Sequence, residues 1–366
     1  MERRDFLKKA GISAAAGAAT VVAAPAIAQS EPNIKWRLAS SFPKTLDTLF
    51  GGTEDFCNRL RQLTNGKFDI RPFPAGEIVP GLQVLDAVKD GTVELCHTAP
   101  YYFFGKNEAF AFDCAVPFGM TARAHNAWMY YGGGMEALRA FYANYGVVNF
   151  LAGNSGCQMG GWFRKPINSV ADLKGLKMRI GGFAGRVMER LGLVPQQIAA
   201  GDIYPSLEKG TIDAAEWIGP FDDEKLGLNK VAPHYYYPGW WEGSTAFSFL
   251  VNKSQWDKLP KSYQAAFETA AAETNVRILA DYDAKNPQAL GRLIKSGAKL
   301  SAFSKDIMEG CFKAANEVME ETASKNPEFK KIYEPWKRFR NDEFQWFRIA
   351  EQAYAQFTFG KQFGKK

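Results

Sequence analysis

The chain has 366 residues, and its 45 lysines and arginines against 39 aspartates and glutamates give a formal net charge of +6. This excess of positive charge is mild and dispersed, which argues against a nucleic-acid-binding protein. The length is greater than one hydrophobic core comfortably supports, so we expect two lobes.

The first 28 residues have the pattern of a secretory signal peptide, which is not a fold element. A basic start is followed by an Ala/Gly-rich apolar run and by the small residues Ala26-Ile27-Ala28. The segment Arg3–Lys8 is similar to the twin-arginine signal, which carries folded proteins across a bacterial membrane. We therefore expect export to the periplasm, by the twin-arginine route.

The next segment alternates predicted strands and helices in the order βαβαβ. The strands are expected over 36–40, 67–73 and 93–99, and the helices over 50–63 and 78–89. This order predicts a parallel sheet with helices on its faces. The loop Pro100–Gly105 follows the third strand, where open α/β sheets bind ligands. Its side chains Tyr101 and Tyr102 form either a pocket wall or a core cluster under the loop.

A broken helix over 122–145 and a strand over 147–152 lead to the first crossing into lobe two. The segment Asp172–Gly182 then reads as a turn and a short strand, with Arg179 near the strand end. A guanidinium at that place can hold a carboxylate through two parallel charge-assisted hydrogen bonds. The alternative is an arginine on a solvated strand, paired with a surface acid.

A strand predicted over 211–217 places Glu216 and Trp217 at a strand end too. A carboxylate in a partly buried crevice is costly unless it is paired or binds a cation. Glu216 therefore either forms a salt bridge with Arg179 or ligates a metal, with Gln158 and Glu242 as further oxygen donors.

The last part of the chain is mostly helical. Its expected elements are an aromatic loop over 234–242, a strand over 246–252 that returns to lobe one, a long helix towards 283, a strand over 299–303, and helices over 306–324 and 329–359. The aromatic loop suits either a hinge wall or packing between the lobes. The final helix has a strongly aromatic face, which either lies on its own lobe or forms an arm that packs on a second subunit.

These elements predict the domain organisation: 29–152 plus about 243–283 form lobe one, 153–242 plus about 284–328 form lobe two, and 329–366 form a C-terminal helical extension. The five scattered cysteines include no C-x-x-C pair and are interpreted as small buried hydrophobes. No H-E-x-x-H, P-loop or G-x-S-x-G motif occurs, so we expect no enzyme.

Two motifs in this order, Asp172–Arg179 and Ile203–Glu216, resemble the extracytoplasmic solute receptors of TRAP transporters, and the similarity covers nearly the whole mature chain. Gln158, Glu216-Trp217 and the Trp240–Glu242 loop look more like the subgroup that binds 2-oxo acids such as pyruvate together with sodium. A neighbouring subgroup takes lactate with calcium. The resemblance implies two α/β lobes with a hinge, a long connecting helix and an extended C-terminal helix exchanged in a homodimer.

The resemblance also implies roles for single residues. Arg179 matches the arginine that clamps the ligand carboxylate, and Tyr101, Tyr102 and Asn154 are expected to contact the ligand, as are Gln158 and Glu216. The positions around the cation are matched by Gln158, Glu216, the carbonyl of Trp217, and Glu242. The expected partners are a small carboxylate, the TRAP membrane permease subunits and a second copy of the chain.

Two rival functions stay open at this point. One is an exported enzyme that uses Glu216 as a general base on an oxo acid. The other is an exported sensor that docks on a membrane signalling partner.

Overall fold

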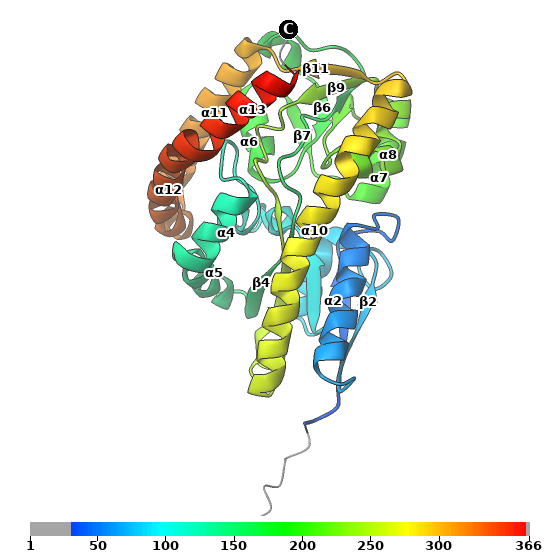
Figure 1. Cartoon of the computed structure of the whole chain (residues 1–366), viewed down its shortest axis with the longest axis vertical. Helices are drawn as coiled ribbons and strands as arrows, with labels where there is room; N and C mark the ends of the chain where they lie inside the picture. The colour runs from blue at the N-terminus through cyan, green and yellow to red at the C-terminus, as the bar shows by residue number, and fades with distance from the viewer. Residues whose placement is uncertain (1–30, 364–366) are drawn as a thin grey trace, which may run out of the picture. The chain divides into compact units, whose positions relative to one another are not determined.

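The computed structural model describes residues 31–363, so the predicted signal peptide lies outside the described residues. Two β-sheets organise the rest of the chain (Figure 1). The first is five-stranded, in the order β2-β1-β3-β10-β4, and the second is six-stranded, in the order β11-β9-β5-β8-β6-β7. The two-lobe α/β fold predicted from the sequence is confirmed.

The strands of the first sheet are β1 (Ile34–Ser40), β2 (Phe68–Phe73), β3 (Leu95–Thr98), β4 (Val147–Asn154) and β10 (Ala246–Asn252). Strands β2 and β3 pair with β1 in parallel, as the βαβαβ pattern predicts. The sheet as a whole is mixed, because β10, whose direction was not predicted, runs antiparallel to both β3 and β4. Strand β10 enters from the other sheet, so its direction is set by the crossing and not by a local βαβ unit.

The second sheet is made of short strands: β5 (Trp162–Phe163), β6 (Lys177–Arg179), β7 (Val194–Gln196), β8 (Ala214–Ala215), β9 (His234–Tyr237) and β11 (Lys299–Ala302). The predicted aromatic loop is wrong in its first half, because β9 pairs with both β5 and β11. Strand β7 and helix α8 (Pro220–Leu226) were not predicted. Both are shorter than the windows in which a hydrophobic period can be recognised.

The helices beside the first sheet are α2 (Leu49–Leu63), α3 (Val84–Lys89), α4 (Ala122–Tyr131), α5 (Gly134–Ala143) and α9 (Lys253–Trp256), with 3₁₀ turns η1 (Gly81–Gln83), η2 (Pro100–Phe103) and η3 (Glu108–Asp113). Those of the second sheet are α6 (Gly182–Arg190) and α7 (Ala200–Glu208), besides α8, with η4 (Val170–Leu173) and η5 (Leu228–Lys230). Helix α7 has Pro205 in its interior.

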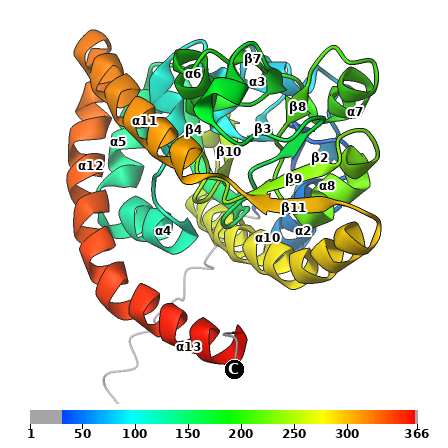
Figure 2. The same ribbon diagram turned by 90° about the horizontal axis from the view of Figure 1, so that it is seen from above.

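A single long helix, α10 (Lys261–Lys295), connects the two halves. It packs against α2 and β4 of the first sheet and then against α8 beside the second, as Figures 1 and 2 show. The prediction ended it near Asp283, but the helix continues through Pro287. Tyr282, just before the predicted end, and Asn286, in the continuation, both reach α8, where their side chains make hydrogen bonds.

The C-terminal region consists of α11 (Lys305–Lys325), α12 (Pro327–Phe347), a π-helical turn η6 (Arg348–Gln352) and α13 (Ala353–Phe363). Helix α11 packs on α6, and α12 packs on α4, α5 and η3. The ring of Phe329 lies 4.8 Å from that of Phe112. The first half of the predicted aromatic helix therefore lies on its own chain, whereas α13 has no buried residue. Between residues 31 and 363, no helix combines the length and apolar character needed to cross a membrane.

One buried carboxyl of the first lobe makes stability depend on pH. Asp113 accepts hydrogen bonds from Tyr142 (2.7 Å), Ser248 (2.9 Å) and Asn149 (3.3 Å), yet burial raises its pKa to about 6. Because the folded chain holds this proton more tightly than the unfolded chain, its contribution to stability is complete below pH ~4 and is lost as the pH rises through about 6.

We therefore expect wild type to lose about 3 kcal/mol of its free energy of unfolding, relative to Asp113→Asn, when the pH rises from 4 to 7. Urea titrations at several pH values measure it. Ser248→Ala removes one donor but keeps the carboxyl, so its free energy of unfolding should depend on pH as steeply as that of wild type. An equal slope in Asp113→Asn would contradict this account.

Candidate ligand and cation site

The predicted site residues come together where the chain passes between the two sheets. Asn154 ends β4, Arg179 ends β6, Glu216 and Trp217 directly follow β8, and Tyr101 and Tyr102 lie on η2 after β3. Strand ends on this edge are where an open α/β sheet presents side chains to a ligand. Every predicted site residue is buried: Tyr101, Tyr102, Asn154, Gln158, Arg179, Glu216, Trp217 and Glu242.

Arg179 is fully buried and held by three groups. Its Nη1 atom donates to the carboxylate of Glu216 and, at 2.7 Å, to the Glu216 carbonyl oxygen, while Nε donates to the carbonyl of Ile198 at 3.2 Å. Burial disfavours the charged guanidinium, but Glu216 together with Tyr101, Tyr102 and Glu242 outweighs it, so the pKa of Arg179 lies above its ordinary value. Of the two alternatives for Arg179, the solvated strand arginine is wrong.

The guanidinium keeps one free edge. Its Nη2 atom has no hydrogen-bond partner although it is buried, and its centre lies 4.9 Å from the ring of Trp217. The salt bridge with Glu216 and the clamp for a ligand are therefore compatible, because they use different nitrogen atoms. An unpaired N–H on a buried cation is costly unless an acceptor meets it.

Two buried carboxylates lie close together in this site. Burial raises the pKa of Glu216, opposed by Arg179. Burial raises the pKa of Glu242 well above its ordinary range, and the charge of Glu216 adds to this rise. Glu242 accepts a hydrogen bond from the Thr245 hydroxyl, and the side chain of Tyr101 also bonds to it. Two carboxylates that repel each other in a site without water are stabilised when a positive charge binds between them.

The oxygen atoms around these acids fit a hard cation. The amide nitrogen of Gln158 donates to Ser155 (3.1 Å) and Thr245 (2.8 Å), which leaves its Oε1 atom buried and without a donor. The Oε2 atom of Glu216 is likewise buried and unpartnered. Within residues 31–363 no group of three or more His, Cys, Asp or Glu side chains could hold a metal. A cation here would rest on two carboxylates and neutral oxygens, a set that suits sodium or calcium better than a transition metal.

The site also contains buried side-chain N–H groups that have no acceptor. Asn154 uses Oδ1 to accept the Gly156 N–H at 2.8 Å, and its Nδ2 atom is buried without a partner. The indole nitrogens of Trp240 and Trp241 are also buried and unpartnered. Buried free donors, together with the free edge of Arg179, suit an anionic ligand with several acceptor oxygens.

Sequence reasoning missed the residues that orient this set. Thr245 and Ser155 hold Gln158 and Glu242, and the Ile198 carbonyl holds Arg179. None of them stands in a motif, because a supporting hydroxyl or carbonyl is recognisable only from its neighbour in space. Cys57, Cys96, Cys114 and Cys311 are buried as predicted, but Cys157, next to Gln158, is exposed.

Tyr101 closes the site from the side of the first sheet. It packs on Gly181 and Gly182, which follow Arg179, and a Cβ atom at Gly181 would stand 2.5 Å from the Tyr101 ring. Next to it, the Gln197 side chain donates to the Tyr102 carbonyl at 2.7 Å. The glycine pair thus gives Tyr101 the room to approach the strand end that carries Arg179.

The substitution Gly181→Ala is expected to push the Tyr101 ring away, which lowers the free energy of unfolding by about 1–3 kcal/mol and weakens carboxylate binding. Thermal unfolding and calorimetric titration with pyruvate measure the two effects. Gly201→Ala on α7 is the matched control, because a Cβ atom there meets nothing within 4 Å. Unchanged affinity in Gly181→Ala would contradict the role given to Tyr101.

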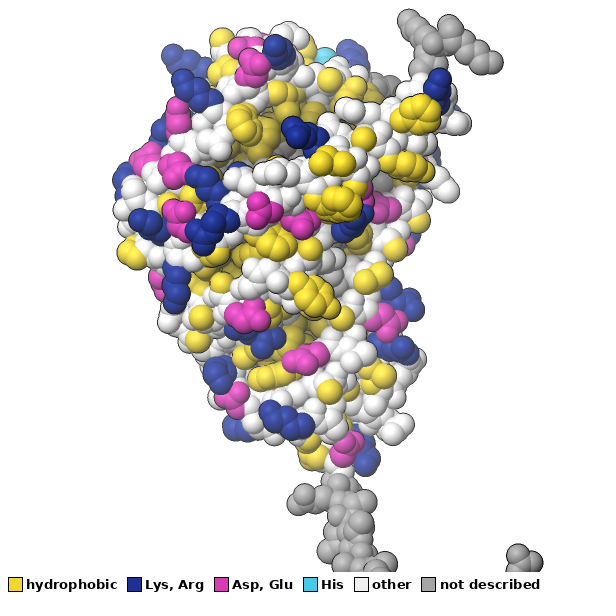
Figure 3. All heavy atoms as spheres, turned by 60° about the vertical axis from the view of Figure 1, so that its left-hand side comes forward, with side chains coloured by type: hydrophobic (Ala, Val, Ile, Leu, Met, Phe, Trp, Pro, Cys, Tyr) yellow, Lys and Arg dark blue, Asp and Glu magenta, His cyan; other side chains and the backbone are white. Residues whose placement is uncertain are grey.

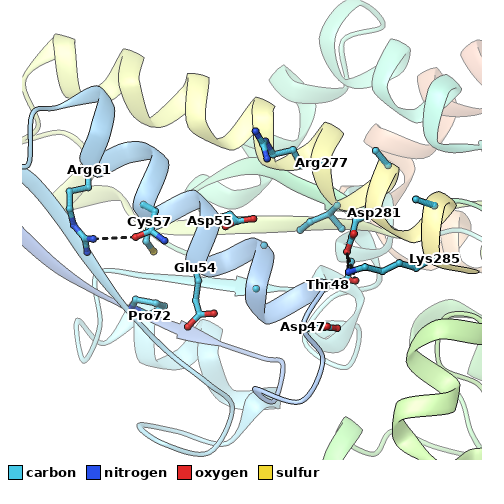
Figure 4. A pocket seen from close by; sticks show the side chains of 16 residues that line it. Asp47, Thr48, Glu54, Asp55, Cys57, Arg61, Pro72, Arg277, Asp281 and Lys285 are labelled. Carbon is cyan, nitrogen blue, oxygen red and sulfur yellow. Dashed lines mark hydrogen bonds and ion pairs between the residues drawn. The ribbon is translucent and has the colours of Figure 1, made fainter.

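The largest groove among the described cavities lies elsewhere, between α2 and α10, with a volume of about 890 Å³ (Figure 4). None of the predicted site residues lines it. Its acids and bases largely pair with each other or with neighbours: Asp281 bonds to Thr48 and Lys285, and Asp47 bonds to Lys225. The groove is therefore a polar surface feature of the first lobe and separate from the buried site.

Comparison with known proteins places this geometry in a family. Residues 39–326 match the bacterial extracellular solute-binding protein family 7. The monocarboxylate 2-oxoacid-binding periplasmic protein of Nostoc sp. PCC 7120 is 50% identical over 365 residues, which cover 99% of this chain and 100% of the relative.

Two solved structures share the fold closely. A TRAP transporter solute-binding protein of Bordetella bronchiseptica, described as a mixed-occupancy dimer with calcium and picolinate in one active site, is 55% identical with a TM-score of 0.89, over 90% of this chain and 98% of that one. A TRAP periplasmic solute-binding protein of Pseudoalteromonas atlantica with bound sodium and pyruvate is 37% identical with a TM-score of 0.86, over 88% and 99%. The chain belongs to family 7 of the bacterial extracellular solute-binding proteins, the solute receptors of TRAP transporters.

Proposed function

We propose that this protein captures a small 2-oxo monocarboxylate such as pyruvate in the periplasm, together with a sodium ion, and delivers it to the TRAP membrane permease. Calcium is the alternative ion. The observation that carries the proposal is the buried free edge of Arg179 beside the unpartnered oxygens of Gln158 and Glu216. The Nostoc relative's name and the pyruvate in the Pseudoalteromonas structure support it.

The roles of the site residues follow from their free atoms. Arg179 holds the ligand carboxylate through Nη2, Asn154 donates through Nδ2, and Tyr101 and Tyr102 cover the ligand from the first lobe. Gln158, Glu216, the Trp217 carbonyl and Glu242 hold the cation. When bound, the ion neutralises the repulsion between these acids and the ligand carboxylate.

The size of the ligand limits its affinity. Pyruvate has about six heavy atoms, and the best tiny ligands gain roughly 1.5 kcal/mol per atom, so the free energy of binding reaches about −9 kcal/mol. This corresponds to a Kd on the order of 1 μM or just below. Such binding requires nearly every ligand atom to be engaged, which complete burial of the site allows.

Isothermal titration of the wild-type protein with pyruvate tests the proposal, with sodium, with calcium, and after removal of both ions. We expect binding near the micromolar range that weakens when both ions are removed. Pyruvate should also be recovered intact after incubation, because we propose a receptor that performs no chemistry. Absence of binding in every ionic condition, or turnover of the ligand, would contradict the proposal.

Export by the twin-arginine route belongs to the same proposal and rests on residues 1–28. We expect Arg3→Lys with Arg4→Lys to retain the precursor in the cytoplasm. Unchanged export of this variant would instead indicate the general secretory route.

We also propose that the C-terminal helix forms a homodimer. From Trp346 onward six large apolar side chains are exposed, whereas Phe347 packs partly against the core. The exposed side chains are Trp346, Ile349, Tyr354, Phe357, Phe359 and Phe363. Figure 3 shows the face of the chain to which α11, α12 and α13 belong, with apolar side chains exposed on it. Exposed apolar surface of this extent is typical of a protein interface.

Tyr354→Glu with Phe357→Glu is expected to convert the dimer to a monomer, measured by light scattering after size-exclusion chromatography. Val276→Glu, another exposed apolar position but on α10, is the control and should leave the mass unchanged. A monomeric wild type at all concentrations would exclude the dimer.

A further inference from the structure

Two adjacent aspartates on α8 are buried beneath the second sheet. Asp222 is completely buried, and its Oδ2 atom accepts hydrogen bonds from the Trp217 indole N–H at 3.1 Å and from the Tyr282 hydroxyl at 2.8 Å. A buried carboxylate that gathers two donors from distant parts of the chain fixes both of them in one arrangement.

The neighbouring Asp223 has the same chemistry but other partners. Its Oδ2 atom accepts from the Trp162 indole N–H at 2.9 Å and from the Tyr235 hydroxyl at 2.7 Å, and its Oδ1 atom accepts from the Ile218 backbone N–H at 3.4 Å, but it makes no bond to the Trp217 indole. Trp162 and Tyr235 stack on each other at 3.9 Å within the second sheet. Asp223 thus holds the sheet together, whereas Asp222 points to the ligand site.

Trp217 connects Asp222 with the arginine of the site. Its ring lies 4.9 Å from the Arg179 guanidinium centre, and its backbone directly follows Glu216, the arginine's ion-pair partner. The indole nitrogen is bound to Asp222, so the ring cannot rotate without breaking that bond. Asp222 therefore fixes the orientation of the Trp217 ring on which the Arg179 guanidinium packs.

Tyr282 connects the same carboxylate with α10, the helix that packs on both halves of the fold. A second contact joins α10 to α8, since the Asn286 side chain accepts the Phe221 N–H at 3.0 Å. A change in how α10 lies on α8 would move Tyr282, and with it Asp222 and the Trp217 ring.

We propose that Asp222 is a positioning residue for carboxylate binding, which together with Tyr282 fixes the Trp217 ring under Arg179 and so aims the free guanidinium edge at the ligand. The proposal rests on the ligand role given to Arg179. Asp222 acts only through Trp217, and its other neighbour, Tyr282, belongs to the connecting helix.

The test compares matched variants of the two aspartates. Asp222→Asn and Tyr282→Phe disturb the Trp217 anchor, whereas Asp223→Asn and Tyr235→Phe disturb the Trp162 anchor with the same change of atoms and the same burial. Pyruvate affinity is measured by calorimetry, and thermal unfolding is measured for all four. We expect a Kd about tenfold higher in the first pair and within about twofold of wild type in the second, despite similar losses of stability.

A spectroscopic signature separates positioning from general destabilisation. NMR spectra of protein labelled with ¹⁵N at the indole and arginine nitrogens show this signature. The Trp217 indole N–H and Arg179 Nε–H resonances are assigned from their loss in Trp217→Phe and Arg179→Lys. Asp222→Asn should shift both resonances. Asp223→Asn should shift the Trp162 N–H resonance and leave those two in place.

Equal losses of affinity in both pairs, or unmoved Trp217 and Arg179 signals in Asp222→Asn, would overturn the proposal. If Asp222→Asn does not fold, Tyr282→Phe decides between the same outcomes, because it removes only one hydroxyl. Failure of wild type to bind pyruvate contradicts the proposed function alone, since the two resonances report on the anchor without ligand.

Discussion

Replacing Arg179 with Met is expected to weaken carboxylate binding by at least about 30-fold and to destabilise the fold. The guanidinium supplies the only free charged donor edge that we find among the described site residues, and truncating one partner of a buried charge pair costs about 2–5 kcal/mol of binding, or roughly 30-fold to several thousandfold in Kd. The substitution also leaves Glu216 buried without its cation, which costs about 3–5 kcal/mol of folding free energy. Calorimetric titration and urea unfolding at pH 7 measure these losses.

A second substitution separates the two effects. In Arg179→Met combined with Glu216→Gln, no uncompensated ion of the pair is left, so most of the stability should return while binding stays as weak as in Arg179→Met. Arg186→Met is the control, because its 2.8 Å ion pair with Glu108 is partly exposed and should contribute no more than about 1 kcal/mol. Recovery of pyruvate binding in the double variant would show that Arg179 does not hold the ligand.

Replacing Glu242 with Gln is expected to change which cation the protein prefers. With Arg179 paired to Glu216, the carboxylate of Glu242 and that of the ligand remain to be neutralised, and calcium supplies two charges where sodium supplies one. The amide keeps an oxygen donor but removes one charge. Because calcium carries two charges, we expect its affinity to fall by about 100-fold, and that of sodium by much less; each tenfold change corresponds to about 1.4 kcal/mol.

Calcium and sodium titrations in the presence of saturating pyruvate measure the ratio of calcium affinity to sodium affinity for wild type and variant. Glu189→Gln on α6, an exposed acid, is the control and should leave both affinities unchanged. A calcium-to-sodium ratio that is the same in Glu242→Gln and in wild type would show that Glu242 is not a cation ligand. Thr245→Ala, which removes a hydroxyl bonded to both Glu242 and Gln158, should weaken both ions together.

The local pattern was reliable where side chains alternate or repeat over a long enough segment. The five elements from β1 to β3, the paired helices α4 and α5, and the strand β10 that returns to the first sheet were all predicted close to their observed places. It missed β7 and α8, which are too short for a periodic signal, and it said nothing of the direction of β10, which depends on a partner strand about 100 residues away. Pairing direction is a property of two segments, so one segment cannot encode it.

The sequence by itself determined the chemistry available to this protein: an arginine and a glutamate at predicted strand ends, together with Gln158 and with Glu242 of the predicted aromatic loop, in a chain whose motifs resemble those of TRAP solute receptors. Only the tertiary structure decided how these groups share their bonds. Arg179 gives Nη1 to Glu216 and keeps Nη2 free, while Gln158 gives its amide nitrogen to Ser155 and Thr245 and keeps its oxygen free. The physical reason is that burial makes every unpaired polar atom costly, and which atoms are left unpaired depends on neighbours that are distant in sequence but adjacent in space.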